Sequence, residues 1–542
     1  MRSYDYVIAG AGSAGCVLAA RLSEDPGVSV CLVEAGPPDS ADEIHLPAGV
    51  LAIGTSRYDW SLFSDPEPGL GGRQRYLPRG RTLGGSSSVN AMVYIRGNPA
   101  DYDGWEALGH RGWGWRDVLP YFLRAEDNER GASALHGAGG PLSVIDGRSL
   151  HRTCEAFVEA GEQDGLARNE DFNGAGQDGV GWYQVTQRNG MRCSASVAYL
   201  HPVLGRDNLT LITGAHVTRV LLDGLAATGI EVDREGAMEQ IGAEREVIMC
   251  AGAYQSPQIL LLSGIGPADD LSLVGIPAVH ELPVGRGLQD HPATWISYTT
   301  DEPSLLHAET EENLGLLTTQ GRGPLTSNFA ESGGFIRTDD GLDAPDVQLH
   351  MIPLLFPEAG AGEIRVDGWA LSACLLRPTS VGFVKLRSRV PSAKPRVLHN
   401  YLTTADDRAA LLRGLRRALR ITRQRALRGV TTGACDVPAG DDDASLLAHM
   451  ERATTTIYHP VGTCGMGRVV DDELRVLGME SLRVVDASVM PTPVRGNTNA
   501  PTIMVAELAA DLIRGRLARS TRSDAVPVPT AGPAPTAVTA RV

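Results

Sequence analysis

Residues 4–15 read YDYVIAGAGSAG, and this stretch decides the fold of the chain. Its apolar first half, residues 4–9, predicts a short buried parallel strand, and the six residues that follow fit the pattern GxGxxG. The next ten residues, CVLAARLSED, predict an amphipathic helix, and a second predicted strand at 28–33 ends at Glu34. This strand–turn–helix–strand order is typical of a dinucleotide-binding unit.

Each part of this unit has a physical purpose. The glycines allow a tight turn and a close approach of the backbone to a pyrophosphate, while the helix N-terminus offers unpaired N–H groups to it. Glu34 lies nineteen residues beyond Gly15, where a carboxylate holds a ribose hydroxyl. The alternative is a glycine-rich turn without a ligand, and the joint register of strand, glycines, helix and acid disfavours it. The motif alone does not separate FAD from NAD.

Composition narrows the classes of protein. The length of 542 residues predicts several domain-sized units, and the net charge of −16 disfavours nucleic acid or an anionic membrane as a partner. The eight cysteines are scattered without zinc spacing, which predicts reduced, mostly buried thiols and no metal site. No apolar run approaches the roughly 20 residues that span a bilayer, and the N-terminus enters a strand pattern directly. We expect a cytoplasmic protein without a transmembrane segment.

Two further clusters carry distinctive patterns. Residues 79–90, RGRTLGGSSSVN, combine little side-chain bulk with many donors, as suits a loop that passes close to a flat ring or a phosphate; the alternative is a flexible linker. Residues 252–266, GAYQSPQILLLSGIG, follow a predicted strand at 246–251 and on periodicity alone form a structural strand–turn–helix unit.

Taken in order with GLQDHP at 287–292 and GNTNAPTIMVAELAADLI at 496–513, these motifs resemble the glucose–methanol–choline (GMC) oxidoreductase family. The resemblance covers about residues 4–514 and is nearest to the choline dehydrogenase and alcohol dehydrogenase branch. It implies an α/β fold: a Rossmann-like FAD-binding domain assembled from discontinuous segments, and an α+β substrate domain with an antiparallel sheet.

The motif order predicts how the chain is divided. The FAD-binding domain is expected from residues 1–150, 192–294 and 451–519, with a connecting or substrate-domain segment at 151–191 and the substrate domain at 295–450. Within the substrate domain, 344–356 and 380–388 are strand-like, 408–427 is helical with a solvated basic face, and 438–445 is an exposed loop. Residues 520–542, rich in Pro, Ala and Thr, are expected to be disordered.

The catalytic residues are implied by the resemblance. In the segment 457–467, IYHPVGTCGMG, His459 matches the histidine that lies over the flavin and takes the proton of the substrate hydroxyl. Its partner matches Asn497, with Asn499 as a competitor two residues away. An imidazole is a suitable proton acceptor, an asparagine amide can donate to a developing alkoxide, and the C–H hydride passes to flavin N5. The alternative for His459 is a satisfied structural histidine.

The resemblance also implies the cofactor contacts and a non-covalent FAD, because Val89 stands where some members carry the histidine that bonds flavin. A predicted strand at 482–491 brings Asp486 and Ala487 towards the cofactor. We expect His291 to have a structural or supporting role and Cys464 to be a packing thiol, while Tyr458 is equally a substrate contact or a core residue. The residues expected to contact FAD are Gly10, Gly12, Ser13, Ala14, Gly15, Glu34, Ala35, Arg81, Gly84, Gly85, Ser86, Asn90, Ala91, Met92, Val93, Val217, Asp486, Ala487 and Thr498.

The sequence therefore predicts an FAD-dependent enzyme that oxidises a small-molecule alcohol to a carbonyl and passes electrons to O2 or to a quinone or other redox carrier. Two alternatives remain open: a non-redox flavin-containing lyase of the hydroxynitrile lyase kind, and a non-catalytic flavoprotein. Choline is one possible substrate, but an aromatic content of 5% does not place the cage that a quaternary ammonium would need.

Overall fold

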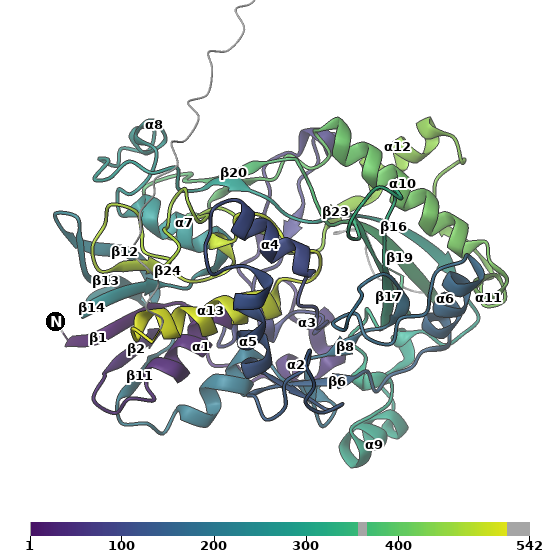
Figure 1. Cartoon of the computed structure of the whole chain (residues 1–542), viewed down its shortest axis with the longest axis horizontal. Helices are drawn as coiled ribbons and strands as arrows, with labels where there is room; N and C mark the ends of the chain where they lie inside the picture. The colour runs from purple at the N-terminus through teal and green to yellow at the C-terminus, as the bar shows by residue number, and fades with distance from the viewer. Residues whose placement is uncertain (1, 356–365, 517–542) are drawn as a thin grey trace, which may run out of the picture.

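The computed structural model describes residues 2–355 and 366–516, and the predicted tail at 520–542 lies outside them. Two large sheets organise the chain, one on the left and one on the right in Figure 1. The left-hand sheet is mixed and Rossmann-like, and the right-hand sheet is antiparallel. The α/β class with these two sheets, predicted from the sequence, is confirmed.

The mixed sheet is built from strands far apart in the sequence. Its strand order is β11-β2-β1-β14-β13-β12, with β24 beside β14. The parallel members are β1 (Arg2–Ala9), β2 (Val30–Val33), β11 (Leu209–Ile212), β14 (Ala237–Met249) and β24 (Leu482–Val484); β12 (His216–Asp223) and β13 (Ala226–Arg234) are antiparallel.

The strands predicted at 4–9 and 28–33 differ from β1 and β2 by two residues at one end, and two other predicted strands of this sheet differ by more. The strand expected at 246–251 is the end of the longer β14, whose first half pairs with β13 before its second half reaches β1. The strand expected at 482–491 is wrong beyond Val484. The Asp486 side chain accepts the N–H of Ser488 at 2.8 Å and begins a 3₁₀ turn, Ala487–Val489, which ends the extended backbone.

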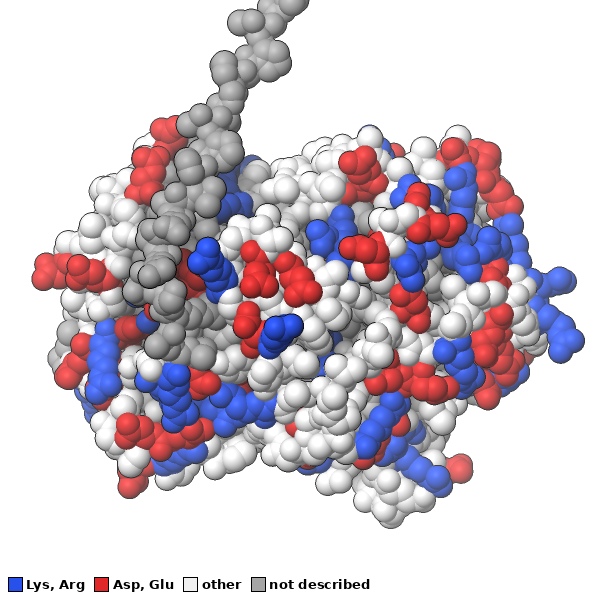
Figure 2. Space-filling view, viewed as in Figure 1, with Lys and Arg blue, Asp and Glu red and all other residues white. Residues whose placement is uncertain are grey.

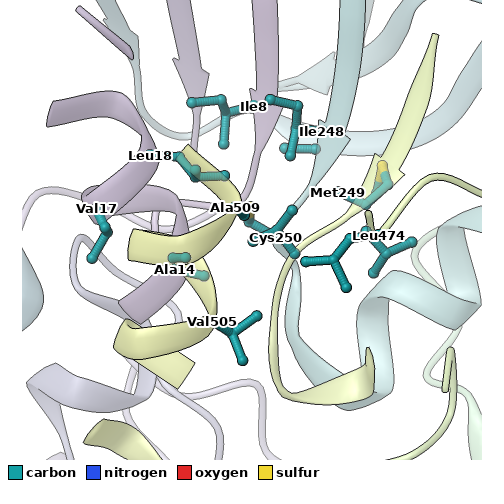
Figure 3. Close-up of a cluster of buried hydrophobic side chains, with 14 of the residues drawn as sticks. Ile8, Ala14, Val17, Leu18, Ile248, Met249, Cys250, Leu474, Val505 and Ala509 are labelled. Carbon is teal, nitrogen blue, oxygen red and sulfur yellow. The ribbon is translucent and has the colours of Figure 1, made fainter. Parts of the chain in front are cut away.

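Helices α1 (Ser13–Leu22) and α13 (Asn499–Ile513) pack together over this sheet. Both are almost wholly apolar on their buried positions, as expected of helices inside a large core. Figure 3 shows this packing through the labelled side chains Ala14, Val17 and Leu18 of α1, Val505 and Ala509 of α13, and Ile8 and Ile248 of the strands beneath.

A buried carboxylate ties α13 to its neighbours. Glu507 is fully buried, and its oxygens accept from Arg21 of α1 at 2.8 Å, from Arg124 of α5 (Trp115–Ala125) at 2.7 Å and from the Tyr199 hydroxyl at 2.9 Å. Two guanidinium groups and a hydroxyl compensate the cost of burying this charge. The C-terminal helix is thereby fixed to the first helix of the chain.

The antiparallel sheet has the order β22-β16-β19-β18-β17-β7, with β23 also beside β16. One face is packed by α6 (Arg152–Gln163) and α10 (Ala405–Thr422), and the opposite face carries a separate apolar cluster. The strands are β7 (Gly179–Trp182), β16 (Pro292–Thr299), β17 (Ser332–Ile336), β18 (Val347–Ile352), β19 (Gly368–Leu375), β22 (Gly433–Asp436) and β23 (Thr454–Thr456).

The predicted strand at 380–388 forms β20 (Gly382–Lys385), but it joins β15 (Arg286–Leu288) and β21 (Arg396–Leu398) in a separate three-stranded sheet. The predicted loop at 438–445 ends where α12 begins at Asp443, because the Asp442 side chain caps that helix. The remaining helices are α2 (Asp42–His45), α3 (Val50–Ile53), α4 (Pro99–Ala107), α7 (Gly252–Leu262), α8 (Ala268–Ser272), α9 (Glu311–Gln320), α11 (Arg425–Arg428) and α12 (Asp443–Ala453).

Acidic and basic side chains are interspersed on the face drawn in Figure 2. The basic side of α10 follows this pattern, because Arg417 and Arg420 both pair with Asp164, at 2.5 and 2.6 Å. Within residues 2–355 and 366–516, no helix is long and apolar enough to cross a membrane.

Candidate active site

A cavity of about 610 Å³ is lined by residues from both large sheets. Its volume falls within the ordinary range for sites that hold small molecules or cofactors, about 300–1,000 Å³. Gly10 and Glu34 come to it from the carboxyl ends of β1 and β2, and Trp295 and Ile352 come from β16 and β18. The carboxyl ends of parallel strands are where α/β folds bind their ligands.

The structure brings most of the predicted cofactor residues to the wall of this cavity. The exceptions are Gly15, Arg81 and Gly84, which do not line it. Arg81 lies over the Trp60 ring, 5.3 Å from its centroid, and its charge partly offsets the effect of burial on Glu34. The predicted residues that do line the cavity are Gly10, Gly12, Ser13, Ala14, Glu34, Ala35, Gly85, Ser86, Asn90, Ala91, Met92, Val93, Val217, Asp486, Ala487 and Thr498.

At one end of the cavity, Gly12 directly precedes α1 and has no side chain to cap it, so the first N–H groups of the helix are available to a ligand. Glu34 braces the turn in front of this helix. One of its oxygens accepts the N–H of Ala11 at 3.0 Å and the other accepts the N–H of Gly36 at 2.8 Å. Burial raises the pKa of Glu34 to about 7.

The loop that carries Gly85 packs directly on this turn. A Cβ on Gly85 would lie 2.7 Å from the Cα of Gly12, and its φ of +52° favours glycine. Further along, the buried Arg192 donates to the Asn90 side-chain oxygen at 2.9 Å, and the Met92 N–H donates to the same oxygen at 3.0 Å. These bonds occupy the Asn90 oxygen, which leaves the amide N–H groups as donors for the cavity.

The predicted base His459 lies in the cavity wall, 8% exposed. Its Nδ1 is 3.0 Å from Nδ1 of His291, and its Nε2 is 3.3 Å from Nδ2 of Asn497. His291 Nε2 is 3.1 Å from the Leu376 carbonyl oxygen. A carbonyl oxygen only accepts, so the neutral His291 carries its hydrogen on Nε2 and accepts on Nδ1. His459 then carries its hydrogen on Nδ1, and its Nε2 keeps a lone pair beside Asn497.

The electrostatics keep this pair neutral. Burial lowers the pKa of His459 well below its usual value, and His291, His350 and Arg79 lower it further. Burial also lowers the pKa of His291 to about 4. At neutral pH, His459 is therefore a free base.

Asp290 holds the backbone of both histidines. One carboxylate oxygen accepts the N–H groups of His291 and His459, each at 2.8 Å. The other accepts the hydroxyls of Tyr401 at 2.5 Å and Thr456 at 2.6 Å. The four acceptor positions of this buried carboxylate are filled, so Asp290 positions the histidines rather than facing the cavity.

The two candidate asparagines have different surroundings. The Asn497 oxygen accepts from Gln348 Nε2 at 3.2 Å while its nitrogen faces His459. The Asn499 oxygen accepts from the Ser13 hydroxyl at 2.8 Å at the start of α13. Of the two, the structure pairs Asn497 with the histidine.

The sequence prediction missed Gln348 and His350, which lie side by side on one face of β18. His350 Nδ1 is 3.2 Å from the Ser372 hydroxyl on the neighbouring strand, and burial lowers the pKa of His350 to about 3. The only local signal was the alternation in QLHMI, which places Gln348, His350 and Ile352 on the same face.

The other residues considered from the sequence lie as follows. Cys464 is buried, and burial raises the pKa of its thiol, as expected of an unreactive packing residue. Tyr458 lines the cavity with a φ of +73°, and its carbonyl oxygen accepts from Arg79 at 2.6 Å. Val89 also lines the cavity. No group of three or more potential metal ligands occurs among the residues that the structure describes.

Comparison with known proteins identifies the family. Models described as GMC oxidoreductase match residues 4–293 and 378–506. The chain belongs to the GMC oxidoreductase family. This GMC oxidoreductase is 43% identical to "Choline dehydrogenase, mitochondrial" of Homo sapiens over 95% of this chain and 90% of that protein. It is 42% identical to "Alcohol dehydrogenase [acceptor]" of Pseudomonas putida over 94% of this chain and 95% of that protein.

A comparison with solved structures leads to the same family. This GMC oxidoreductase superposes on pyridoxine 4-oxidase from "Mesorbium loti" with a TM-score of 0.86 and 33% identity, covering 94% of this chain and 99% of that one. The predicted family, its FAD cofactor and enzyme activity on CH–OH groups are thus confirmed.

The residues present fit FAD. The glycine turn admits close approach of a pyrophosphate, since a Cβ on Gly12 would have no atom nearer than 3.9 Å, while the uncapped α1 supplies N–H groups. From there the cavity wall runs through the 85–93 loop to His459, so that one continuous site can hold a dinucleotide beside the histidine.

Proposed function

We propose that this GMC oxidoreductase oxidises an alcohol to a carbonyl with His459 as the proton acceptor. The observation that carries the proposal is the hydrogen-bond chain from Leu376 through His291 to His459, which leaves the lone pair of His459 Nε2 beside Asn497. A proton acceptor must be neutral and must have a lone pair that the substrate can reach. Burial keeps His459 neutral, and its Nε2 lone pair is engaged only by a long hydrogen bond from Asn497, 3.3 Å, which a substrate hydroxyl would replace.

The remaining side chains would position the alcohol. Its hydroxyl would donate to Nε2 of His459 and accept from the amide of Asn497, whose orientation is fixed by Gln348. As the O–H proton moves to Nε2, negative charge develops on the alcohol oxygen, and the Asn497 N–H stabilises it. Bound FAD supplies the acceptor for the hydride, at its N5 position. The products are a carbonyl compound and the reduced cofactor.

We propose that FAD is held non-covalently by the glycine turn, the 85–93 loop and the Asp486 turn. Val89 lines the cavity at the position expected for covalent attachment, and a valine cannot form that bond. Acid precipitation of the protein should leave all the yellow colour in the supernatant. Colour that stays with the pellet would show a covalent bond elsewhere.

The activity is tested by adding alcohols anaerobically and following the visible flavin band. We expect an alcohol to bleach the band, and His459→Gln to slow bleaching by about 10²–10⁴-fold with flavin content unchanged. His307→Gln is the matched control, because His307 is 63% exposed on the surface. Readmitting air then separates O2 from a quinone or other carrier as the electron acceptor, and the name of the Pseudomonas putida relative favours a carrier.

The same experiment separates the two other candidate functions. A flavin that no alcohol reduces, in a protein that cleaves cyanohydrins, would favour a lyase. A flavin that no alcohol reduces, in a protein without lyase activity, would favour a non-catalytic flavoprotein. An equal bleaching rate in wild type and His459→Gln would remove the role proposed for the histidine.

A further inference from the structure

The face of the antiparallel sheet that lies opposite α6 and α10 contributes to the wall of the cavity beyond His459. On β18 the side chains of Gln348, His350 and Ile352 share this face, and the register places Ser372 and Trp295 of the next two strands in line with His350. Gln348 bonds to Asn497, so the row starts at the catalytic pair and leads away from it. A substrate held at His459 would extend its body along this row.

The side chains of this wall are apolar, except for two polar ones that carry no charge. Gln348 is an uncharged amide, and burial lowers the pKa of His350 to about 3, so that its ring is neutral. The apolar side chains that line the cavity from this cluster are Val93, Trp295, Phe329, Ala330, Ile352 and Leu354.

Behind the histidines, the oxygens of the buried Asp290 are filled by four hydrogen bonds. Two further carboxylates line the cavity, Asp436 and Asp59, and both have partners. Asp436 is paired with the Arg452 guanidinium at 3.1 Å. Asp59 accepts the N–H groups of Arg79 at 2.7 Å and Ser61 at 3.0 Å. Asp436 is therefore held in an ion pair, and the oxygens of Asp59 are occupied by hydrogen bonds.

The other two carboxylates that line the cavity belong to the cofactor end. Glu34 bonds the glycine turn, and Asp486 accepts from the N–H of Gly252 at 2.9 Å and from Ser256. In the described parts of the chain, no further Asp or Glu lines this cavity.

A positive charge also acts on His459. Arg79 lines the cavity, donates to the Tyr458 carbonyl, and contributes to the low pKa of His459. A cation placed here would lose its hydration, find the nearby carboxylate oxygens already bonded, and be repelled by the guanidinium. A neutral apolar group would lose only water that it binds weakly.

We infer that the substrate is an uncharged alcohol whose apolar body lies along the face formed by Trp295, Ile352 and Leu354, and that a quaternary ammonium alcohol is disfavoured. This inference rests on the proposed function, because it takes His459 as the point where the hydroxyl is held. It distinguishes the chain from what the name of its choline dehydrogenase relative states of that protein.

The test compares two alcohols of the same shape. Choline and 3,3-dimethylbutan-1-ol differ in one atom, a quaternary nitrogen in place of a carbon. We expect the neutral alcohol to reduce the flavin with a kcat/KM at least about tenfold higher, which corresponds to a difference of about 1.4 kcal/mol. Calorimetric titration of the flavin-loaded His459→Gln protein, in which turnover is suppressed, should show the same order of binding.

The outcomes separate the inference from the proposed function. If choline reduces the flavin or binds better than its isostere, the substrate class is wrong while alcohol oxidation stands. If neither compound binds and only other charged alcohols reduce the flavin, the apolar wall does not hold the substrate and the inference fails. If no alcohol reduces the flavin, the proposed function fails.

A matched pair of variants tests the wall itself. Ile352→Glu places a carboxylate on it, and Ile352→Gln adds the same bulk without charge. We expect the choline-to-isostere ratio of kcat/KM to rise about tenfold or more in Ile352→Glu and to stay near the wild-type ratio in Ile352→Gln. An unchanged ratio in a flavin-loaded Ile352→Glu protein would place the substrate elsewhere. If that variant does not retain flavin, the wild-type comparison decides the inference.

Discussion

The two sheets contribute to one cavity by different means. The mixed sheet contributes backbone: a glycine turn, an uncapped helix start and a loop whose glycine lies against Gly12. The antiparallel sheet contributes side chains, with Gln348, His350 and Trp295 placed by the pairing of three strands. The first arrangement has no room for an added atom at Gly10, Gly15 or Gly85, whereas the second is set by which side chain stands at each register position.

Because of this difference, the two ends of the cavity depend on different kinds of residue. A backbone site depends on local sequence, because each glycine is needed by its immediate neighbours in space. A side-chain wall can change one residue at a time while the strands keep their pairing. We therefore expect cofactor binding and substrate choice to respond to separate sets of substitutions.

The largest effect should come from the packed face of the antiparallel sheet. Met351 and Ile352 are neighbours on β18 that point to opposite faces, one into the cluster under α10 and the other to the cavity. Met351→Ala should lower the free energy of unfolding by about 2–5 kcal/mol, as is usual for a large side chain deleted from a core. Ile352→Ala should cost less stability and mainly raise KM. Thermal unfolding and steady-state kinetics of both variants measure the contrast, and equal loss of stability would contradict it.

The next largest effect should come from the end of the cavity that is formed by the glycine turn before α1. A Cβ on Gly15 would lie 1.9 Å from the Gly10 carbonyl oxygen, so Gly15→Ala must push α1 away from the turn. We expect the free energy of unfolding to fall by about 1–3 kcal/mol and most of the bound FAD to be lost. Thermal unfolding measures the first effect, and the ratio of flavin to protein absorbance measures the second. Gly104→Ala, in α4 with no atom within 4 Å, is the control and should be neutral or slightly stabilising. Full flavin content in Gly15→Ala would show that the turn is not tightly constrained.

A smaller effect should follow from His291. His291→Phe removes the acceptor for the Nδ1 hydrogen of His459 and leaves a buried donor unsatisfied, at a cost of about 1–2 kcal/mol. The rate of flavin reduction should fall about 10- to 30-fold, because the hydrogen of His459 can then move to Nε2. His291→Gln can still accept this hydrogen bond and should recover part of the rate. Identical rates in the two variants would mean that His291 only fills space.

The smallest expected effect is the dependence of the rate of flavin reduction on pH. Because the pKa of His459 is depressed, its base form is present throughout the neutral range and is lost only as the pH falls well below 6.5. The rate of flavin reduction should therefore stay constant as the pH falls through 6.5 and should decline only in more acidic solution. Stopped-flow measurements across this range test the point. An inflection at or above pH 6.5 would argue that the proton goes to another group.

The same contrast determines how much could be predicted from the sequence. Residues 10–15 and Glu34 predict a dinucleotide site, because the turn, the helix and the strand follow one another in the sequence. The structure brings the turn and Glu34 together. His350 could not be found this way, since its place beside Ser372 and Trp295 depends on pairing between strands that are distant in sequence. The strand expected at 482–491 failed for a local reason, because the Asp486 side chain competes with the extended backbone.

For the catalytic residues, the family resemblance singled out His459 and left Asn497 and Asn499 open. The structure separates the asparagines by their partners, one facing His459 and the other bonded to Ser13. His291 was expected to be a supporting residue, and it lies directly against His459. Its role as proposed here depends on a bond to the Leu376 carbonyl, which no sequence pattern reveals.

The link between α1 and α13 bears on how the protein is made. Arg21 and its partner Glu507 are separated by 486 residues, and β24, which completes the mixed sheet, begins only at Leu482. While the chain is being synthesised, the apolar face of α1 is therefore exposed until α13 has also been made. Contacts between such distant segments form slowly, and ribosome stalling before residue 499 would yield a chain with an incomplete FAD site.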